Sequence, residues 1–499
     1  MPAPRSSKTS VRIRCYRQGF GDCFLLSFRT GRARPSHVLI DCGLWPSGAG
    51  PTARMREIVA DIAKETGGTA TKRGEIDVLV VTHEHWDHLS GFNQARDLFE
   101  TKLKVRAVWL AWTENPQDPL AQKLRAEQEK KIKVAGQIRA RLRALSSRPG
   151  FSEAGKVALR QLDSLLGFFG AAGAMGGVQG AMSFVREGWS GPERSFHQPG
   201  DLLPLPGAAG VRVYVLGPPR DAAKLRRESS TQQGALYELF YGVTLEDSLL
   251  GALGALEDEV ARFRDPAELG QPFDRAHRHA LHLASPAPAA ALPPELADFF
   301  ARHYADEAWR RIDTDWLHVG GALALRLDRG INNTSLVLAF ELPDGRVLLF
   351  PGDAQLGNWE SWHDPAIEWS SRTPGGPRIV ARDLLARTVF YKVGHHGSHN
   401  ATAQDRGLEL MNHPDLRAFI PISHQMALVN GWDRIPLPGL VRRLREKARG
   451  RVWFAVEYDQ DGKAFTNPEI DALTELTKAE RTALRKSVTE KPLSFDFAL

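Results

Sequence analysis

Val81-Thr82-His83-Glu84-His85-Trp86-Asp87-His88 is the stretch of sequence that decides the interpretation of the whole chain. It continues the apolar run Val78-Leu79-Val80, so a hydrophobic segment ends in three histidines and two acidic residues. This pattern predicts a buried strand that leads into a functional loop. Alternate side chains of an extended loop share a face, which brings His83 and His85 together.

The side chains of this loop predict a metal site. Imidazole nitrogens and carboxylate oxygens are ligands for zinc, and also for iron or manganese. His83 and His85 can serve one ion, and Asp87 and His88 can serve a second. The alternative is a surface loop that is rich in histidine by chance. The clustering of these residues directly after an apolar strand argues against it.

The composition is that of a globular protein. The chain has 499 residues, of which 42% are hydrophobic and 25% are charged. The formal net charge of +6 is a mild basic excess, which permits an anionic substrate without requiring one. Cys15, Cys23 and Cys42 supply neither a disulfide framework nor a closely spaced zinc motif, so we expect a reducing, cytoplasmic location.

Two segments bear on membrane association. Residues 1–10 are polar and basic, and they lack the apolar centre of a secretory signal. Residues 164–185 contain no charged residue, but six glycines make the segment only moderately apolar. We therefore expect no membrane association, and we interpret 164–185 as a buried or mobile glycine-rich segment.

Strand and helix patterns alternate with short connections in two separate parts of the chain, which indicates an α/β layer fold. We predict the first half of the core over 1–112 and the second half over 316–460. A further core strand is predicted within 200–219.

Two mostly helical insertions, 113–199 and 220–315, are predicted to interrupt this core. The first contains a long helix over 117–146, whose basic face is interpreted as solvated rather than as a phosphate-binding surface. Residues 461–499 are predicted to form a C-terminal helix, started by Asn467, and a tail. Insertions on such scaffolds select substrates or bind protein partners.

Two more predicted strands end in side chains of ligand type. Asp353 follows the strand pattern of 347–350, and the run from His395 to His399 follows that of 389–393. The ends of strands in layered α/β folds converge on one rim. We therefore expect these side chains to join the histidine loop in one site.

These motifs, in this order, resemble the metallo-β-lactamase superfamily. The finer pattern is similar to the ComEC-like subgroup, named after a competence protein, and the resemblance covers roughly half of the chain. The motifs that carry it are Gly19-Phe20-Gly21-Asp22, Leu39-Ile40-Asp41-Cys42-Gly43, the histidine loop, Asn332-Asn333-Thr334-Ser335, Gly352-Asp353-Ala354 and Lys392-Val393-Gly394-His395-His396-Gly397-Ser398.

The resemblance implies a four-layer αββα sandwich with a site for one or two zinc ions, or manganese. It assigns Asp353 as a bridge between the ions, because a carboxylate has two oxygens to share. The last ligand is His396 or His395, and a ligand histidine directly before glycine favours His396. Asp41 is expected to orient a ligand histidine.

One departure from the family pattern concerns the first ion. Many members have a further histidine ligand in the region that corresponds here to residues 332–335. An amide is a poor zinc ligand, so Asn333 is at best a weak candidate. The first ion would then be weakly held or completed by water.

The resulting hypothesis is a metal-dependent hydrolase that uses a metal-bound hydroxide, with Asp87 orienting the hydroxide or accepting its proton. His395, or less favourably His399 or His424, would donate a proton or hold a phosphate oxygen. The expected substrate contains phosphate, as in a phosphodiesterase or nuclease acting on nucleic acid or nucleotides. Alternatives are a hydrolase of a lactone, thioester or amide, and a non-catalytic protein that binds a partner through its insertions.

Overall fold

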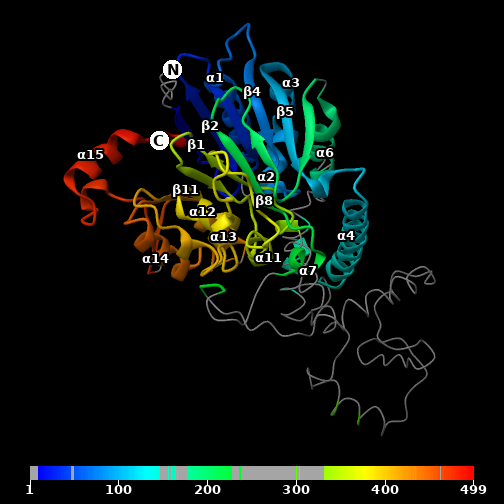
Figure 1. Cartoon of the computed structure of the whole chain (residues 1–499). Coiled ribbons are helices and arrows are strands. Elements are labelled where there is room, and N and C mark those ends of the chain that lie inside the picture. The colour runs from blue at the N-terminus through cyan, green and yellow to red at the C-terminus, as the bar shows by residue number, and fades with distance from the viewer. Residues whose placement is uncertain are drawn as a thin grey trace. The chain divides into compact units, whose positions relative to one another are not determined.

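The computed structural model describes residues 9–45, 50–146, 177–189, 191–227, 331–430 and 434–499 except 461, with isolated positions between these ranges. The chain divides into two units. The larger comprises Met1–Gln128, Leu166–Tyr241 and Asp328–Leu499, and the smaller comprises Glu129–Leu165 and Gly242–Leu327. Every residue predicted for the metal site lies in the larger unit, whose elements Figure 1 labels.

The first sheet of the larger unit has eight strands in the order β16-β17-β1-β2-β3-β4-β5-β6. Its first five strands pair antiparallel with their neighbours, and the strands from β3 to β6 run parallel. The strands are β1 (Thr9–Tyr16), β2 (Cys23–Thr30), β3 (Ser36–Cys42), β4 (Gly74–Val80), β5 (Leu103–Ala111), β6 (Glu193–His197), β16 (Val488–Glu490) and β17 (Ser494–Ala498).

The second sheet has seven strands in the order β13-β12-β11-β10-β9-β8-β7. Strands β9 and β10 form a hairpin: they pair antiparallel around Gly345, whose φ of 89° suits a tight turn. From β10 to β13 the strands run parallel. The strands are β7 (Leu202–Pro204), β8 (Arg212–Gly217), β9 (Val337–Glu341), β10 (Val347–Phe350), β11 (Thr388–Lys392), β12 (Arg417–Ser423) and β13 (Val452–Val456).

The two sheets pack face to face around an aromatic core. Phe24 on β2 lies 5.6 Å from Phe350 on β10, and Phe28 lies 5.8 Å from Phe340 on β9, measured between ring centroids. Successive side chains of a strand point to opposite faces. Strands buried on both faces are therefore continuously apolar, as in Val78-Leu79-Val80 of β4, where Leu79 packs away from the other sheet.

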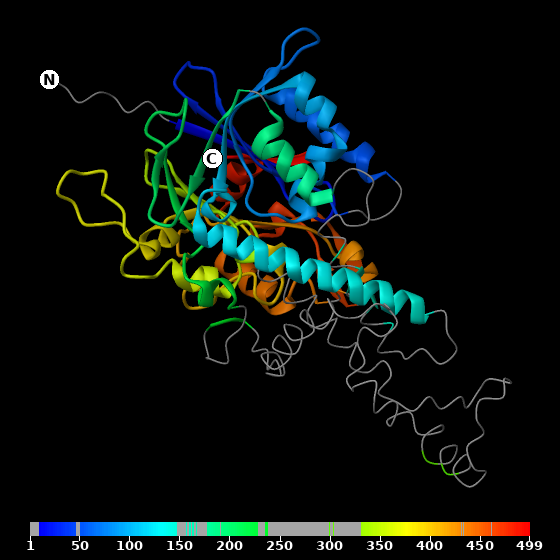
Figure 2. The ribbon, with the colours of Figure 1, turned by 90° about the vertical axis from the view of Figure 1, so that its right-hand side faces the viewer.

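Helices cover the outer face of each sheet (Figures 1 and 2). Apolar side chains of α1 pack on the first sheet, and those of α12 and α14 pack on the second. This produces the predicted order of layers, helix, sheet, sheet, helix. The helices are α1 (Pro51–Glu65), α2 (Trp86–Gln94), α3 (Arg96–Lys102), α4 (Pro119–Ser146), α6 (Gly177–Ser183), α7 (Ala222–Leu225), α11 (Leu356–Ser361), α12 (Ala381–Ala386), α13 (His424–Val429), α14 (Pro438–Lys447) and α15 (Lys478–Ser487).

Two segments differ from the sequence-based expectation. The C-terminal helix begins at Lys478, capped by Thr477 and Glu480, and not at Asn467, whose side chain accepts a hydrogen bond from the Phe454 backbone. The residues after it form β16 and β17, because alternate side chains such as Phe497 are buried between the sheets. Strand β6, inside the predicted insertion 113–199, extends the first sheet beside β5.

Several predictions fall on residues that the structure does not describe. They include the start of the second half of the core, residues 316–330, most of the second insertion 220–315 and most of the glycine-rich segment 164–185. Within the described ranges, no helix combines the length and apolar character needed to cross a membrane.

Candidate metal centre

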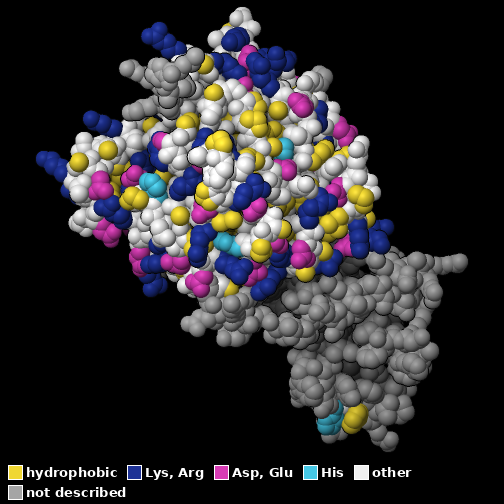
Figure 3. Space-filling model, viewed as in Figure 1, with side chains coloured by type: hydrophobic (Ala, Val, Ile, Leu, Met, Phe, Trp, Pro, Cys, Tyr) yellow, Lys and Arg dark blue, Asp and Glu magenta, His cyan; other side chains and the backbone are white. Residues whose placement is uncertain are grey.

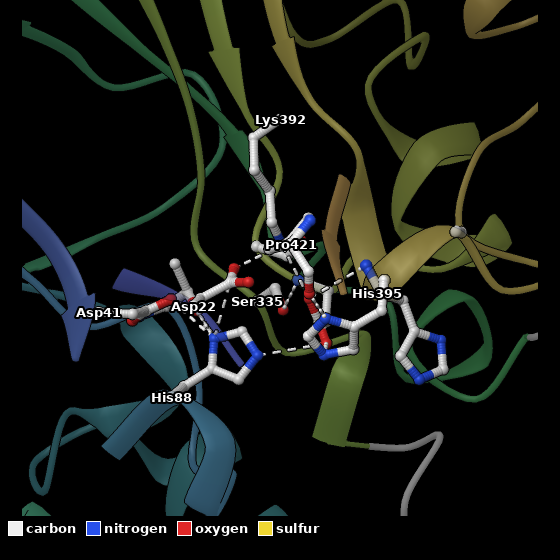
Figure 4. Close-up of polar contacts among 12 residues, drawn as sticks. Asp22, Asp41, His88, Ser335, Lys392, His395 and Pro421 are labelled. Carbon is white, nitrogen blue, oxygen red and sulfur yellow. Dashed lines mark hydrogen bonds and ion pairs between the residues drawn. The ribbon is translucent and has the colours of Figure 1, made fainter. Parts of the chain in front are cut away.

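The predicted ligands meet where strands of both sheets end. The loop from His83 to His88 follows β4, Asp353 follows β10 and His396 follows β11. The predicted ligand side chains are each at most 2% exposed: His83, His85, Asp87, His88, Asp353 and His396. Figure 4 shows the site, with His88 and Asp41 on the left, His395 on the right and Lys392 above them.

Four donor atoms surround one point in this site. His88 Nε2 lies 3.2 Å from Asp353 Oδ2 and 3.6 Å from Asp87 Oδ2. His396 Nε2 lies 3.4 Å from Asp353 Oδ2 and 2.9 Å from Asp87 Oδ2. Donors about 2.0–2.1 Å from a tetrahedral zinc ion are about 3.3–3.4 Å from one another. The spacing of the four atoms therefore fits one divalent ion.

Unpartnered atoms in the cluster give the same indication. Asp87 Oδ1 and His88 Nε2 are buried, and neither has a hydrogen-bond partner among the described residues. His88 Nε2 is close enough to Asp353 to bond but is not aligned with it. Buried polar atoms normally have partners, so unpartnered atoms in a cluster of histidines and carboxylates are typical of a metal site, although Asp87 Oδ2 and His396 Nε2 bond to each other at 2.9 Å.

The start of α2 explains how neighbouring residues reach one ion. His85 is the N-cap, and the His88 amide donates to its carbonyl, so the chain turns directly after Asp87. The turn is held by close backbone packing. A Cβ atom on Gly43 would lie 2.2 Å from the Asp87 carbonyl, so no larger residue fits there.

Asp41 orients His88. Its Oδ2 lies 2.8 Å from His88 Nδ1, and the Thr82 backbone amide and hydroxyl donate to the same carboxylate at 2.8 and 2.7 Å. The Nδ1 proton of His88 therefore points at Asp41, which leaves Nε2 for the cluster. This is the contact expected of a residue that orients a ligand.

His396 is oriented in the same way. Its Nδ1 donates to the Pro421 carbonyl at 2.8 Å, so Nε2 faces Asp87 and Asp353. His395 lies outside the four-donor cluster: its Nδ1 is 2.7 Å from Ser398 Oγ and its Nε2 is 3.3 Å from the Asn332 amide nitrogen. This geometry favours His396 as the ligand, in line with the choice made from the sequence.

His395 is partly exposed and lies on the accessible side of the cluster. Burial lowers its pKa to about 4, so its imidazole is neutral at pH 7. A neutral ring can hydrogen-bond a substrate, but the predicted role as proton donor would first need a proton from elsewhere. His399, half-buried in the following turn, is outside the donor cluster. His424 bonds to the Ile435 carbonyl and packs on Tyr458, which is a structural role.

The first ion position has fewer donors. His83 Nε2 and His85 Nδ1 are 3.1 Å apart and can share an ion. Asn333 does not join them. Its amide donates to the Arg227 carbonyl and accepts from the backbone of Gln355 and Asn358, because these buried backbone groups need partners. These contacts do not support a ligand role for Asn333, which stays a prediction.

Asp22 and Lys392 are site residues to which the sequence analysis gave no role. Lys392 Nζ lies 2.5 Å from Asp22 Oδ2 and 2.9 Å from Asp353 Oδ1. Asp22 belongs, with His88, Asp353 and His396, to a group of possible donors within 4.8 Å of one another. Because Asp22 Oδ2 bonds to Lys392 while Asp87 Oδ2 reaches His396, we assign the fourth ligand to Asp87. Both missed residues lie in quoted motifs, but only the fold shows that they meet.

The centre carries excess negative charge. Four carboxylates, those of Asp22, Asp41, Asp87 and Asp353, are at most 1% exposed, and Lys392 pairs with two of them, Asp22 and Asp353. Burial would lower the pKa of His88, but the carboxylates, Asp353 first, raise it well above its usual value. The same balance raises the pKa of His396. Groups that hold protons so firmly mark a position that favours a cation.

The comparison with known families agrees with this geometry. Residues 19–171 match the family model of the metallo-beta-lactamase superfamily. No curated protein matches the chain. The match contains the histidine loop but ends before Asp353 and His396, which the fold brings to it. The predicted fold class, an αββα metallo-β-lactamase sandwich, is confirmed, whereas the ComEC-like resemblance stays a prediction.

Proposed function

We propose that the chain is a divalent-metal-dependent hydrolase whose substrate is a phosphodiester, in nucleic acid or a nucleotide. The observation that carries the proposal is the cluster of Asp87, His88, Asp353 and His396, whose donor atoms have the spacing of a tetrahedral ion. The family match supports the hydrolase class. The ComEC-like motifs and the net charge of +6 support the phosphodiester.

The four clustered side chains would hold the metal. Two imidazoles and two carboxylates suit zinc, and manganese accepts the same donors. When bound, the metal supplies a Lewis acid that polarises a substrate oxygen and lowers the pKa of water.

The chain's own residues would do the remaining work. Asp87 Oδ1 has no hydrogen-bond partner among the described residues, so it can orient a water molecule or accept its proton. The neutral His395, held by Ser398 and the Asn332 amide, would position the substrate on the accessible side. Asp41 keeps the His88 ring aimed at the metal.

The surface informs the substrate class only weakly. On the face seen in Figure 3, basic and acidic side chains of the described residues are interspersed, without a uniformly basic field. Long nucleic acid is usually bound by such a field. A lactone, thioester or amide therefore remains the second candidate class, and a partner-binding protein without catalysis the third.

The test is turnover by purified, zinc- or manganese-loaded protein on bis-p-nitrophenyl phosphate, single-stranded DNA and a thioester. We expect phosphodiester cleavage that Asp353→Ala abolishes. His37→Gln is the matched control, because His37 is a buried imidazole bonded to Ser27, away from the donor cluster. Turnover of the thioester alone would assign the second class, and a metal-loaded protein inactive on every substrate would favour the third.

A further inference from the structure

We propose that Lys392 is a positioning residue that makes the centre a site for one tightly held ion, with a second ion bound only weakly at His83 and His85. The inference rests on the proposed divalent-metal centre, but it concerns the number of ions and not the reaction. It follows from where the two oxygens of Asp353 point.

Lys392 is buried, and its ammonium group makes all its hydrogen bonds inside the protein. Its side chain is 1% exposed, and Nζ donates to Asp353 Oδ1 at 2.9 Å, to the Gly352 carbonyl at 2.7 Å and to Asp22 at 2.5 Å. An ammonium group has three protons, so all its donors are used. Lys392 therefore has no proton left for a substrate, and its charge acts on the two carboxylates alone.

Because of this contact, the two oxygens of the Asp353 carboxylate have different partners. Oδ1 accepts from Lys392 and from the His395 backbone amide at 3.0 Å, while Oδ2 faces His88 and His396. His395 has a φ of 40°, a left-handed conformation that is strained for a non-glycine residue. Strain of this kind persists where surrounding contacts enforce it, and here it aims the amide at Oδ1.

The first ion position is left short of ligands. His83 and His85 supply two nitrogens, and Asn333 faces the opposite way. A carboxylate that used one oxygen for each ion would be the natural third ligand, but Asp353 Oδ1 is occupied by an ammonium that repels a second cation. Zinc normally takes four ligands, so an ion there would depend on water and on sharing Oδ2.

The experiment counts bound ions. Parent protein is dialysed against buffers of defined free Zn²⁺, and bound zinc is measured by elemental analysis. We expect one equivalent at nanomolar free zinc and a second only at a concentration at least about 100-fold higher, a gap of about 2.8 kcal/mol. Two equivalents bound with affinities within tenfold of each other would overturn the inference.

Substitutions test which residues bind each of the two ions. His396→Ala should lose the tight equivalent, whereas His83→Ala should keep it with an affinity within about threefold of the parent. Loss of the tight ion in His83→Ala would overturn the assignment. Lys392→Met frees Asp353 Oδ1 and Asp22, so we expect the second ion to bind at least about tenfold more tightly. A folded Lys392→Met protein with unchanged second-ion affinity would refute the role of Lys392.

The matched control is Arg14→Met, which removes another fully buried, ion-paired cation from the larger unit. It should leave both zinc affinities unchanged. If Lys392→Met does not fold, the His83→Ala and His396→Ala pair still decides the ion assignment. Failure of the hydrolase proposal would appear as absent turnover with a normal ion count, so the two outcomes are distinguishable.

Discussion

Two buried cations in the larger unit, Arg14 and Lys392, have similar surroundings and different consequences. Arg14 is 1% exposed and contacts three carboxylates, with Asp496 held by two of its nitrogens and with Asp61 and Glu65 at 2.6 and 2.9 Å. Lys392 is equally buried, but the carboxylates beside it are not all satisfied: Asp22 Oδ1 and, in the adjoining cluster, Asp87 Oδ1 have no hydrogen-bond partner among the described residues.

The difference separates a structural network from a functional one. The Arg14 network is closed, since its guanidinium matches the carboxylates without help from outside. The network at Lys392 is open, because Asp22 Oδ1, Asp87 Oδ1 and His88 Nε2 have no hydrogen-bond partner among the described residues and a divalent ion would supply one. The two cations are equally buried and each pairs with carboxylates, so neither property alone identifies a site. The unmatched donor atoms do.

The largest expected effect is that of removing a ligand from the open network. We expect His396→Ala to lower zinc affinity at least about 100-fold, since roughly 10–16 kcal/mol of binding free energy shared by four ligands is about 3 kcal/mol for each. Competition with a chromophoric chelator measures this affinity. His37→Gln, which removes a buried imidazole elsewhere, should keep the parent value. An unchanged affinity in His396→Ala would mean that the cluster is not the metal site.

Breaking the Arg14 network should lower the free energy of unfolding and leave metal binding unchanged. Arg14→Met removes the buried cation that holds Asp496 through two nitrogens and leaves only the more exposed Lys491 beside it, and breaking a buried pair in this way costs about 3 kcal/mol or more. Urea unfolding of zinc-saturated protein measures the loss. A zinc affinity that fell together with the stability would show that the two networks are coupled, contrary to the comparison drawn above.

A smaller effect is expected at the residue that orients a ligand. Asp41→Asn keeps the shape of the side chain but weakens the acceptor for His88 Nδ1, so we expect zinc affinity to fall about 10–100-fold. The same chelator competition measures it. A loss as large as that of His396→Ala would mean that Asp41 is itself a ligand.

The smallest expected effect concerns pH dependence outside both networks. Burial lowers the pKa of His37 to about 4, below its usual 6.5. The unfolded chain therefore binds the extra proton first, so the contribution of His37 to stability is complete above about pH 6.5 and is lost as the pH falls toward 4. In metal-free protein, His37→Gln should lose less stability than the parent between pH 7 and 4, by on the order of 2 kcal/mol. Parallel urea midpoints for the two proteins would contradict this.

Much of this fold could be predicted from local sequence patterns. The strand patterns of 347–350 and 389–393 correspond to β10 and β11, and the long helix predicted over 117–146 corresponds to α4 at Pro119–Ser146. The C-terminal segment could not be predicted in this way. Asn467 has the pattern of a helix cap, but its side chain bonds to Phe454, and the pairing of β17 with β1 depends on contacts between opposite ends of the chain.

In the candidate site, too, some features could be predicted from the sequence and others could not. The histidine loop, Asp353 and His396 stand out because ligand-type residues follow apolar strands. The role of Lys392 could not be predicted, since its contact with Asp22 joins residues of different sheets. The orientation of Asn333 could not be predicted either, because the backbone groups that its amide hydrogen-bonds come together only in the fold.

The most direct test of the account is the zinc content of purified protein after dialysis against a buffer of nanomolar free zinc, measured beside the thermal unfolding midpoint. The parent protein should retain one equivalent and unfold at a higher temperature than protein stripped with EDTA, because an ion that binds only the folded state stabilises it. Asp353→Asn should retain close to none and show no shift on stripping. A parent protein that retains no zinc and unfolds at the same temperature with and without EDTA would contradict the account.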